Sequence, residues 1–558
     1  MVNRGRSKGC ATCKQRHVKC DEAKPECWHC RRLGLHCEGY QTYGNLKFRD
    51  QTHKFVNSVA QGRACLPSPR PLAEPDTSVP FFLMHYVGMG RNLESARGLF
   101  EILIPVYCSE RQGSPLSLAI SAVASGILSL WRRSVRGFQL SRKSYAEAIA
   151  CMRSAVNDRV QRSNPATVLA ALVLQHYESV AAVYDLRSPS RVHHNGAVSL
   201  LQFMESDRIN GMNGAYIRRF MLHTEVSSAM RQKRPLQSIA YSWIGGKHLM
   251  AAPDNPSSVL DVIGVSVAEF QADYIRLVNH GGVRFLSRRV LEEWRTEAKR
   301  IDKQLLDWAR NVPDHWQPRK LITGQDIDES IPTYRSVCEV YPSCQIANIW
   351  NLWRFQRLLL VKITVDCLQK IIDLFHVELT KDQASGVVDD IFECQETLQK
   401  LVDSVCYSVP FFLGNRTRRS TITDFTDSEI LIPSYYSPAP EDKRSLNTTG
   451  HDAGRSGDDH RRPAIAQGPW HVMSPLSHLL TLFSEDNGQL LASFLRPGHQ
   501  EWIREQFQRV TTLLHLSPKE HSEDKQALFD LSAGRAGNNK TDYLARGVRK
   551  GLKYMSGP

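Results

Sequence analysis

The sequence predicts an all-α protein that is preceded by a small module held together by metal ions. Three observations lead to this fold class. Six of the 14 cysteines lie within the first 40 residues at regular spacing. Apolar residues recur at helical intervals through most of the remaining chain, without strand-like alternation of any length. A proline-rich stretch separates the two regions, as expected for a linker between independently folded parts.

The six N-terminal cysteines form an internal repeat. They follow the pattern C-x2-C-x6-C-x6-C-x2-C-x6-C, and the spacing of the first three recurs 17 residues later. The six residues are Cys10, Cys13, Cys20, Cys27, Cys30 and Cys37.

This spacing favours two zinc ions per chain. A structural zinc ion takes four tetrahedral ligands, and thiolate sulfur is a preferred donor. Six cysteines fill eight ligand positions only if two of them bridge both ions. The repeat indicates the equivalent first members of each half, Cys10 and Cys27, as the bridges. Because so short a segment has little apolar core, metal binding must supply much of its folding free energy.

Three other interpretations remain open from the residues alone. Disulfides are one, although no secretory signal precedes the cysteines. A single four-cysteine site at Cys10, Cys13, Cys27 and Cys30 is another, and it would leave two cysteines unused at matching offsets. A redox pair at Cys27 and Cys30 is the third, and it lacks the expected βαβ surroundings.

Positive charge is concentrated around these cysteines. Residues 1–50 contain 11 Lys and Arg against five Asp and Glu, and the whole chain has a formal net charge of +14. A basic surface on a rigid module suits the neutralisation of phosphates. We therefore expect a nucleic acid as the partner.

The segment "GCATCKQRHVKCDEAKPECWHCRRLGLHCEGY" resembles the fungal Zn2Cys6 binuclear-cluster DNA-binding domain. The resemblance implies a DNA-binding domain over residues 1–44, with a short helix that begins near Cys10 and points its C-terminal end into the major groove. It also implies recognition of CGG-like triplets, usually by paired modules. The positions that contact the triplet in the family are Arg16 and His17 here, where many members have lysine instead of His17. Lys14, Lys19, Arg31 and Arg32 are the candidates for phosphate contacts, which position a protein on DNA.

Composition divides the rest of the chain into five parts. We expect a flexible proline-rich linker over 45–80, a helical domain over 81–437 and a disordered insertion over 438–468. Further helices of the same domain are expected over 469–518, and a loose basic tail over 519–558. Asn164 and Pro165 read as the N-cap and first residue of a helix. The apolar stretch of 116–131 is too short for a membrane span and reads as a buried helix, so we expect no membrane.

The helical part, with "SPLSLAISAVASGILSLWRR" and "HHNGAVSLLQF", is similar to the fungal-specific transcription factor regulatory domain. This resemblance implies an all-α region that regulates activity. The adjacent His193 and His194 are expected to pack or cap rather than to bind metal, and no catalytic motif occurs. The chain is therefore not expected to be an enzyme.

The resulting prediction is a nuclear, sequence-specific DNA-binding transcription regulator with double-stranded DNA as its partner. The alternative is a zinc-cluster interaction module or ligand sensor without DNA specificity of its own. A homodimer, co-regulator proteins and a small-molecule effector remain open as further partners. No sustained heptad repeat follows the cysteines to indicate a coiled-coil dimer.

Overall fold

The computed structural model describes residues 9–39, 77–88, 93–204, 212–244, 255–281, 286–434, 461–462, 466–484, 488–516 and 536–555. The chain separates into two compact units, Met1–Pro75 and Asp76–Pro558.

The first unit is built from two short helices, α1 (Ala11–Gln15) and α2 (Trp28–Arg32), joined by a loop with a cis peptide bond before Pro25. Its interior consists of cysteine side chains. The larger apolar residues lie outside that interior, because Val18, Trp28, Leu33 and Leu35 are 39–52% exposed. A hydrophobic core therefore contributes little to this unit.

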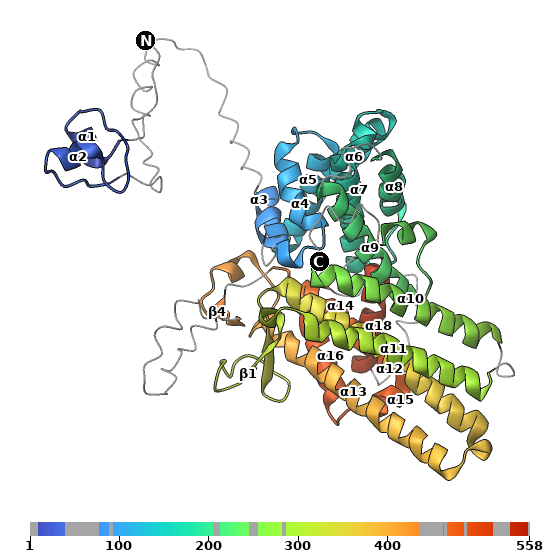
Figure 1. Ribbon diagram of the computed structural model, residues 1–558. Helices are drawn as coiled ribbons and strands as arrows, with labels where there is room; N and C mark the ends of the chain where they lie inside the picture. Colours follow the sequence, from blue (N-terminus) through green and yellow to red (C-terminus); the bar gives the residue numbers. More distant parts are fainter. Residues whose placement is uncertain are drawn as a thin grey trace, which may run out of the picture. The chain divides into compact units, whose positions relative to one another are not determined.

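The second unit is almost entirely helical, as predicted (Figure 1). Its helices are α3 (Ser78–Phe82), α4 (Leu99–Ser109), α5 (Pro115–Arg132), α6 (Val135–Asn157), α7 (Pro165–Tyr184), α8 (Val192–Leu201), α9 (Met212–Gln232), α10 (Pro256–Gly281), α11 (Arg288–Asn311), α12 (Cys344–Phe375), α13 (Lys381–Leu413), α14 (Gly468–Ser484), α15 (Gly488–Ser493), α16 (His499–Leu513) and α18 (Ala536–Gly551). Its strands are β1 (Arg319–Ile322), β2 (Val337–Val340), β3 (Ile432–Pro433) and β4 (Arg461–Arg462).

Local sequence explains where several helices begin. Asn164 caps α7 by accepting the N–H of Ala166 at 2.9 Å, and Pro165 occupies the first turn, as predicted. Ser114 likewise caps α5 by accepting the N–H of Ser117 at 3.2 Å, and Pro115 is the first residue of that helix. A capping box between Thr380 and Gln383 starts α13.

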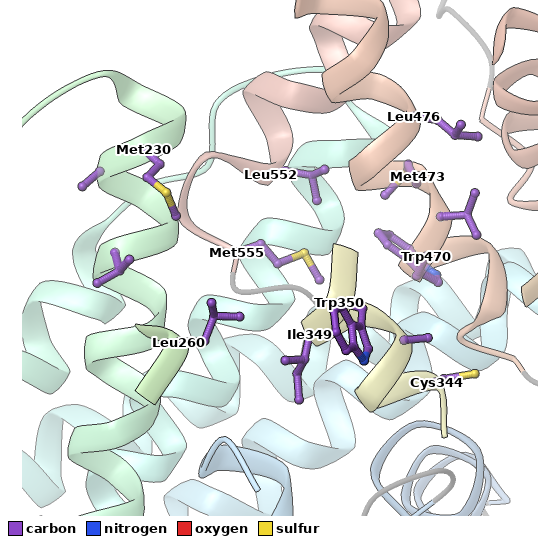
Figure 2. Close-up of a cluster of buried hydrophobic side chains, with 14 of the residues drawn as sticks. Met230, Leu260, Cys344, Ile349, Trp350, Trp470, Met473, Leu476, Leu552 and Met555 are labelled. Carbon is purple, nitrogen blue, oxygen red and sulfur yellow. The ribbon is translucent and has the colours of Figure 1, made fainter. Parts of the chain in front are cut away.

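The helices of the second unit pack around one continuous core. In Figure 1, α5 lies beside α6 and α7, while the long helices α11, α12 and α13 lie side by side. Figure 2 shows how segments far apart in the sequence meet, with Met230 from α9, Trp350 from α12 and Met473 from α14. Leu552 and Met555, which follow α18, join the same cluster.

Among the helices of the described residues, α5 and α7 are long and apolar enough to cross a membrane by length and composition alone. Within the second unit, 61% and 72% of their apolar windows are buried against other helices. Both are core helices of this unit.

The structure also contains two features that the sequence analysis did not anticipate. β1 and β2 pair antiparallel, with Arg319 opposite Val340 and Ile322 opposite Val337. Ala536–Gly551 forms α18 instead of part of a loose tail. An apolar stripe at Leu544, Val548 and Leu552 is buried although the segment is basic overall, and this stripe holds the helix on the core.

Glycine allows α18 to approach α7 closely. A Cβ at Gly551 would lie 2.6 Å from the Cα of Val183, and one at Gly547 would lie 2.9 Å from the side chain of Leu186.

The predicted linker, apart from 77–80, lies outside the described residues. So does the predicted insertion, apart from β4 and 466–468.

Candidate metal centre and nucleic-acid interface

Cysteine sulfurs cap both helices of the first unit. The Sγ atom of Cys10 accepts the backbone N–H of Cys13 at 3.3 Å, and Sγ of Cys27 accepts that of Cys30 at 3.3 Å. Ser, Thr, Asp and Asn oxygens usually make this bond at an N-cap. The C-x2-C spacing thus places each pair one helical turn apart, with both sulfurs turned to the interior.

The two halves of the unit make equivalent backbone hydrogen bonds, which are 17 residues apart in the sequence. Val18 N–H donates to Cys13 C=O at 3.0 Å, and Leu35 N–H donates to Cys30 C=O at 3.0 Å. Two residues after each helix, the backbone adopts a left-handed conformation, at His17 (φ 54°) in the first half and at Gly34 (φ 63°) in the second. The sequence repeat is therefore a repeat of structure.

The six sulfurs form two groups of four. One contains Cys10, Cys13, Cys20 and Cys27, the other contains Cys10, Cys27, Cys30 and Cys37, and within each group the Sγ atoms lie within 4.8 Å of one another. Cys10 and Cys27 are common to both groups.

The spacing of these sulfurs fits tetrahedral zinc. Sγ of Cys10 lies 3.7 Å from that of Cys27 and 3.8 Å from that of Cys30, and Cys13 lies 3.6 Å from Cys27. Zinc–sulfur bonds of about 2.3 Å in a tetrahedron separate two sulfurs by about 3.8 Å. When bound, zinc would join the two halves. Four thiolates around each ion would leave no position for a catalytic water.

Proton release accompanies metal binding at such a site. Burial raises the pKa of the Cys10 thiol to about 12, and burial likewise raises the pKa of Cys13. The pKa of Cys37 is lowered, since the backbone N–H groups of Cys27 and Gly39 stabilise its thiolate. A divalent cation must therefore displace the protons of the Cys10 and Cys13 thiols.

The predicted DNA-contacting residues all lie on the surface of the first unit. Lys14 is in the last turn of α1, and Arg16, His17 and Lys19 follow directly in an exposed segment. Four basic or imidazole-bearing residues within a six-residue segment are thus brought together at the C-terminal end of α1.

Arg31 and Arg32 are exposed on α2. The Arg32 guanidinium lies over the Trp28 ring, 4.8 Å from its centroid. That cation–π contact already engages Arg32. Arg31 occupies the position that Lys14 has in the first half.

Two residues that the sequence analysis missed hold this surface in place. Thr12 Oγ1 donates to His36 C=O and accepts the N–H of Glu38, both at 3.0 Å. Asp21 Oδ2 accepts the N–H of Trp28 at 3.2 Å at the start of α2. Neither residue lies in a pattern that would reveal these roles in advance.

The second unit contains no competing metal centre among its described residues. The two adjacent histidines pack as expected. His193 Nε2 lies 2.8 Å from the hydroxyl of Tyr145. His194 is 2% exposed, and its backbone N–H donates to the side-chain oxygen of Gln175. The candidate functional site is therefore the cysteine module.

Comparison with known proteins agrees with this geometry. Residues 8–43 match the fungal Zn(2)-Cys(6) binuclear cluster domain. Such a cluster binds two zinc ions, which confirms the predicted cofactor. A fungal-specific transcription factor domain was not detected in the helical unit, and no solved structure matches the chain.

Curated relatives are similar to the same short segment. White-opaque regulator 2 of Candida albicans is 44% identical over 46 residues, which is 8% of this chain and 10% of that protein. The lysine biosynthesis regulatory protein LYS14 of Saccharomyces cerevisiae is 59% identical over 29 residues, 5% and 4% of the two chains. The pestheic acid cluster transcriptional regulator 3 of Pestalotiopsis fici is 56% identical over 41 residues, 7% of each. The chain thus shares its zinc module with fungal transcriptional regulators. The matched segment covers between 4% and 10% of the length of these relatives.

Proposed function

We propose that this chain, whose first unit is similar to a DNA-binding zinc-cluster domain, is a sequence-specific transcription regulator that acts in the nucleus. The observation that carries the proposal is the exposed basic segment that directly follows α1 on a metal-held frame. Zinc-cluster domains of this family bind DNA. The helical unit would then regulate the activity of the DNA-bound protein.

The proposal assigns different tasks to the basic residues. Arg16 and His17 would contact base edges of CGG-like triplets in the major groove. Lys14, Lys19 and Arg31 would neutralise phosphates and set the orientation of the module. Arg32 is the least available, because Trp28 already contacts its guanidinium.

We further propose that Cys10 and Cys27 bridge the two zinc ions. Their membership of both four-sulfur groups supports this assignment. Their capping of the two helices supports it too, because a bridging sulfur at each helix start ties both halves to both metal ions.

A second function is favoured by one observation. The second half of the module exposes Leu33 (50%) where the first half carries Arg16, and the equivalent apolar residues Leu35 (39%) and Val18 (40%) are exposed in both halves. Such a surface suits contact with another protein. Under this alternative the module would be an interaction module without DNA specificity.

Selection from a random DNA pool tests both functions. Zinc-loaded full-length protein is incubated with the pool at near-physiological salt, and the enriched sequences are determined. Two CGG-like triplets at a constant spacing would support sequence-specific binding by a dimer, and a single triplet would support a monomer. A lack of enrichment with intact zinc content would contradict the proposal and favour the interaction module. The salt dependence of binding then measures the phosphate contacts.

A further inference from the structure

A cavity in the helical unit is walled by α9, α12 and α14, with contributions from α13, α18 and Arg97 just before α4. The space open to the centre of a water molecule measures about 60 Å³. A single water needs roughly 10–15 Å³ of such space. The cavity thus has room for a small ion or functional group, and we call it the anion cavity.

Positive charge predominates in the wall of the anion cavity. Arg97, Arg231 and Arg549 all line it, together with His223 and His478, whereas no Asp or Glu is among the lining residues. Burial lowers the pKa of Arg231 to about 9, with Arg549 as a further cause. Buried charge is costly without a compensating partner. Asp261 and Glu101, which are not among the lining residues, partly offset the charge of Arg97. With Arg231 and Arg549 added, the wall keeps an excess of positive charge, which favours an anion.

Two of the three guanidinium nitrogens of Arg97 have hydrogen-bond partners. Its Nε donates to Ser257 Oγ at 2.8 Å, and its Nη1 donates to His223 Nε2 at 3.0 Å. His223 Nδ1 in turn donates to Asp261 Oδ1 at 2.7 Å, and Asp261 lies outside the cavity wall. The Arg97 side chain is 92% buried, and Nη2 has no hydrogen-bond partner among the described residues.

The wall formed by α14 presents a second buried donor. Arg549 Nη1 donates to His478 Nδ1 at 2.7 Å, so a neutral His478 carries its proton on Nε2. Burial, with Arg549 as the next cause, holds the pKa of His478 well below its usual range, and the ring stays neutral. His478 is 8% exposed, and within the described part of the chain Nε2 has no partner.

We propose that the anion cavity binds a small anionic group, a carboxylate or a phosphate, through Arg97 Nη2 and His478 Nε2. Both orphaned atoms are donors, and an oxyanion can accept from both. Charge-assisted bonds of this kind are stronger than those to neutral acceptors. Because Arg549 of α18 donates to His478 of α14, an anion held by His478 would also support the packing of α18 against α14. Small anionic metabolites that carry either group are the ligand class.

Titration calorimetry on zinc-loaded full-length protein, freed of excess zinc, tests this site. Sodium phosphate, sodium sulfate and sodium acetate are titrated separately at constant ionic strength set with sodium chloride. We expect saturable binding of one anion per chain. Saturation by phosphate and sulfate alone assigns a tetrahedral oxyanion, and saturation by acetate alone assigns a carboxylate.

Variants locate the binding. Arg97→Met removes the unpartnered donor and should weaken binding at least tenfold. Arg357→Met is the matched control, because Arg357 is also a mostly buried arginine but pairs with Asp302 at 2.6 and 2.9 Å and does not line the cavity. Its dissociation constant should stay within twofold of the wild-type value.

Two results would overturn the proposal. The first is an absence of saturable binding to the wild-type protein, in which case water alone fills the cavity. The second is equal binding by Arg97→Met and Arg357→Met, which would place the anion on another basic surface such as the zinc module. If Arg97→Met fails to fold by circular dichroism, His478→Phe, which removes the other proposed donor, takes its place in the same comparison with Arg357→Met.

Discussion

The two units of this protein reach a stable fold by different means. The zinc module packs cysteine sulfurs at its centre and leaves Trp28 and Leu33 half exposed. The helical unit buries a continuous apolar core that extends from Phe82 to Met555. The first depends on ligand bonds and the second on area removed from water. Perturbations that act on one of these two sources of stability should leave the other unit intact.

Zinc removal should produce the largest difference between the units. A strong chelator should unfold the module, because structural zinc contributes about 10–16 kcal/mol to comparable small domains. DNA binding should be lost while the helical unit keeps its thermal transition. Calorimetry and limited proteolysis before and after chelation measure both. A parallel loss of the helical transition would show that the units do not fold independently.

Cysteine substitutions sharpen the comparison within the module. Cys27→Ala should abolish both metal sites and DNA binding, because Cys27 belongs to both sulfur groups. Cys37→Ala is the matched control, since Cys37 belongs to one group, and it should retain more zinc. The zinc content per folded chain, measured for both variants, tests this expectation. Two zinc ions retained in Cys27→Ala would rule out its role as a bridge.

Mild acid should weaken the helical unit through its buried histidines. Burial lowers the pKa of His194 to about 4, while an unfolded histidine titrates near 6.5. The unfolded state therefore binds more protons between these values, and the free energy of unfolding falls as pH drops from about 6.5 to about 4. The loss from this one group is at most about 3 kcal/mol.

Denaturant unfolding at several pH values measures this slope. His194→Asn should flatten part of it, whereas His376→Asn, at an exposed position after α12, should not. An unchanged slope in His194→Asn would contradict the assignment.

The smallest expected effect separates base contact from phosphate contact. Arg16→Ala should cost roughly 1–3 kcal/mol of DNA binding and relax base preference, whereas Lys19→Ala should weaken binding to all sequences uniformly. Competition binding with matched and mismatched DNA measures both. A uniform loss in Arg16→Ala would mean that Arg16 touches only phosphate.

The sequence predicted the metal site better than the details of the helical unit. Cysteine spacing determines which thiols can reach one ion, so the ligands and the zinc count follow from local sequence. Helical periodicity likewise predicted the all-α class of the second unit and the start of α7 at Asn164 and Pro165. The hairpin of β1 and β2 and the docking of α18 depend on tertiary contacts, such as those of Leu544 and Gly551, which a basic composition conceals. The DNA contacts of Arg16 and His17 stay predictions, because surface exposure alone does not identify a partner.

The repeated backbone of the zinc module carries two unlike surfaces. The same left-handed turn holds His17 in one half and Gly34 in the other, and the neighbouring positions hold Arg16 in one half and Leu33 in the other. A frame with equivalent halves and equivalent side chains could dock in two opposite directions. Here Arg16 and Leu33 occupy equivalent positions, so the two halves present chemically different surfaces. If the module binds DNA as proposed, this difference between its halves would set the direction in which it docks.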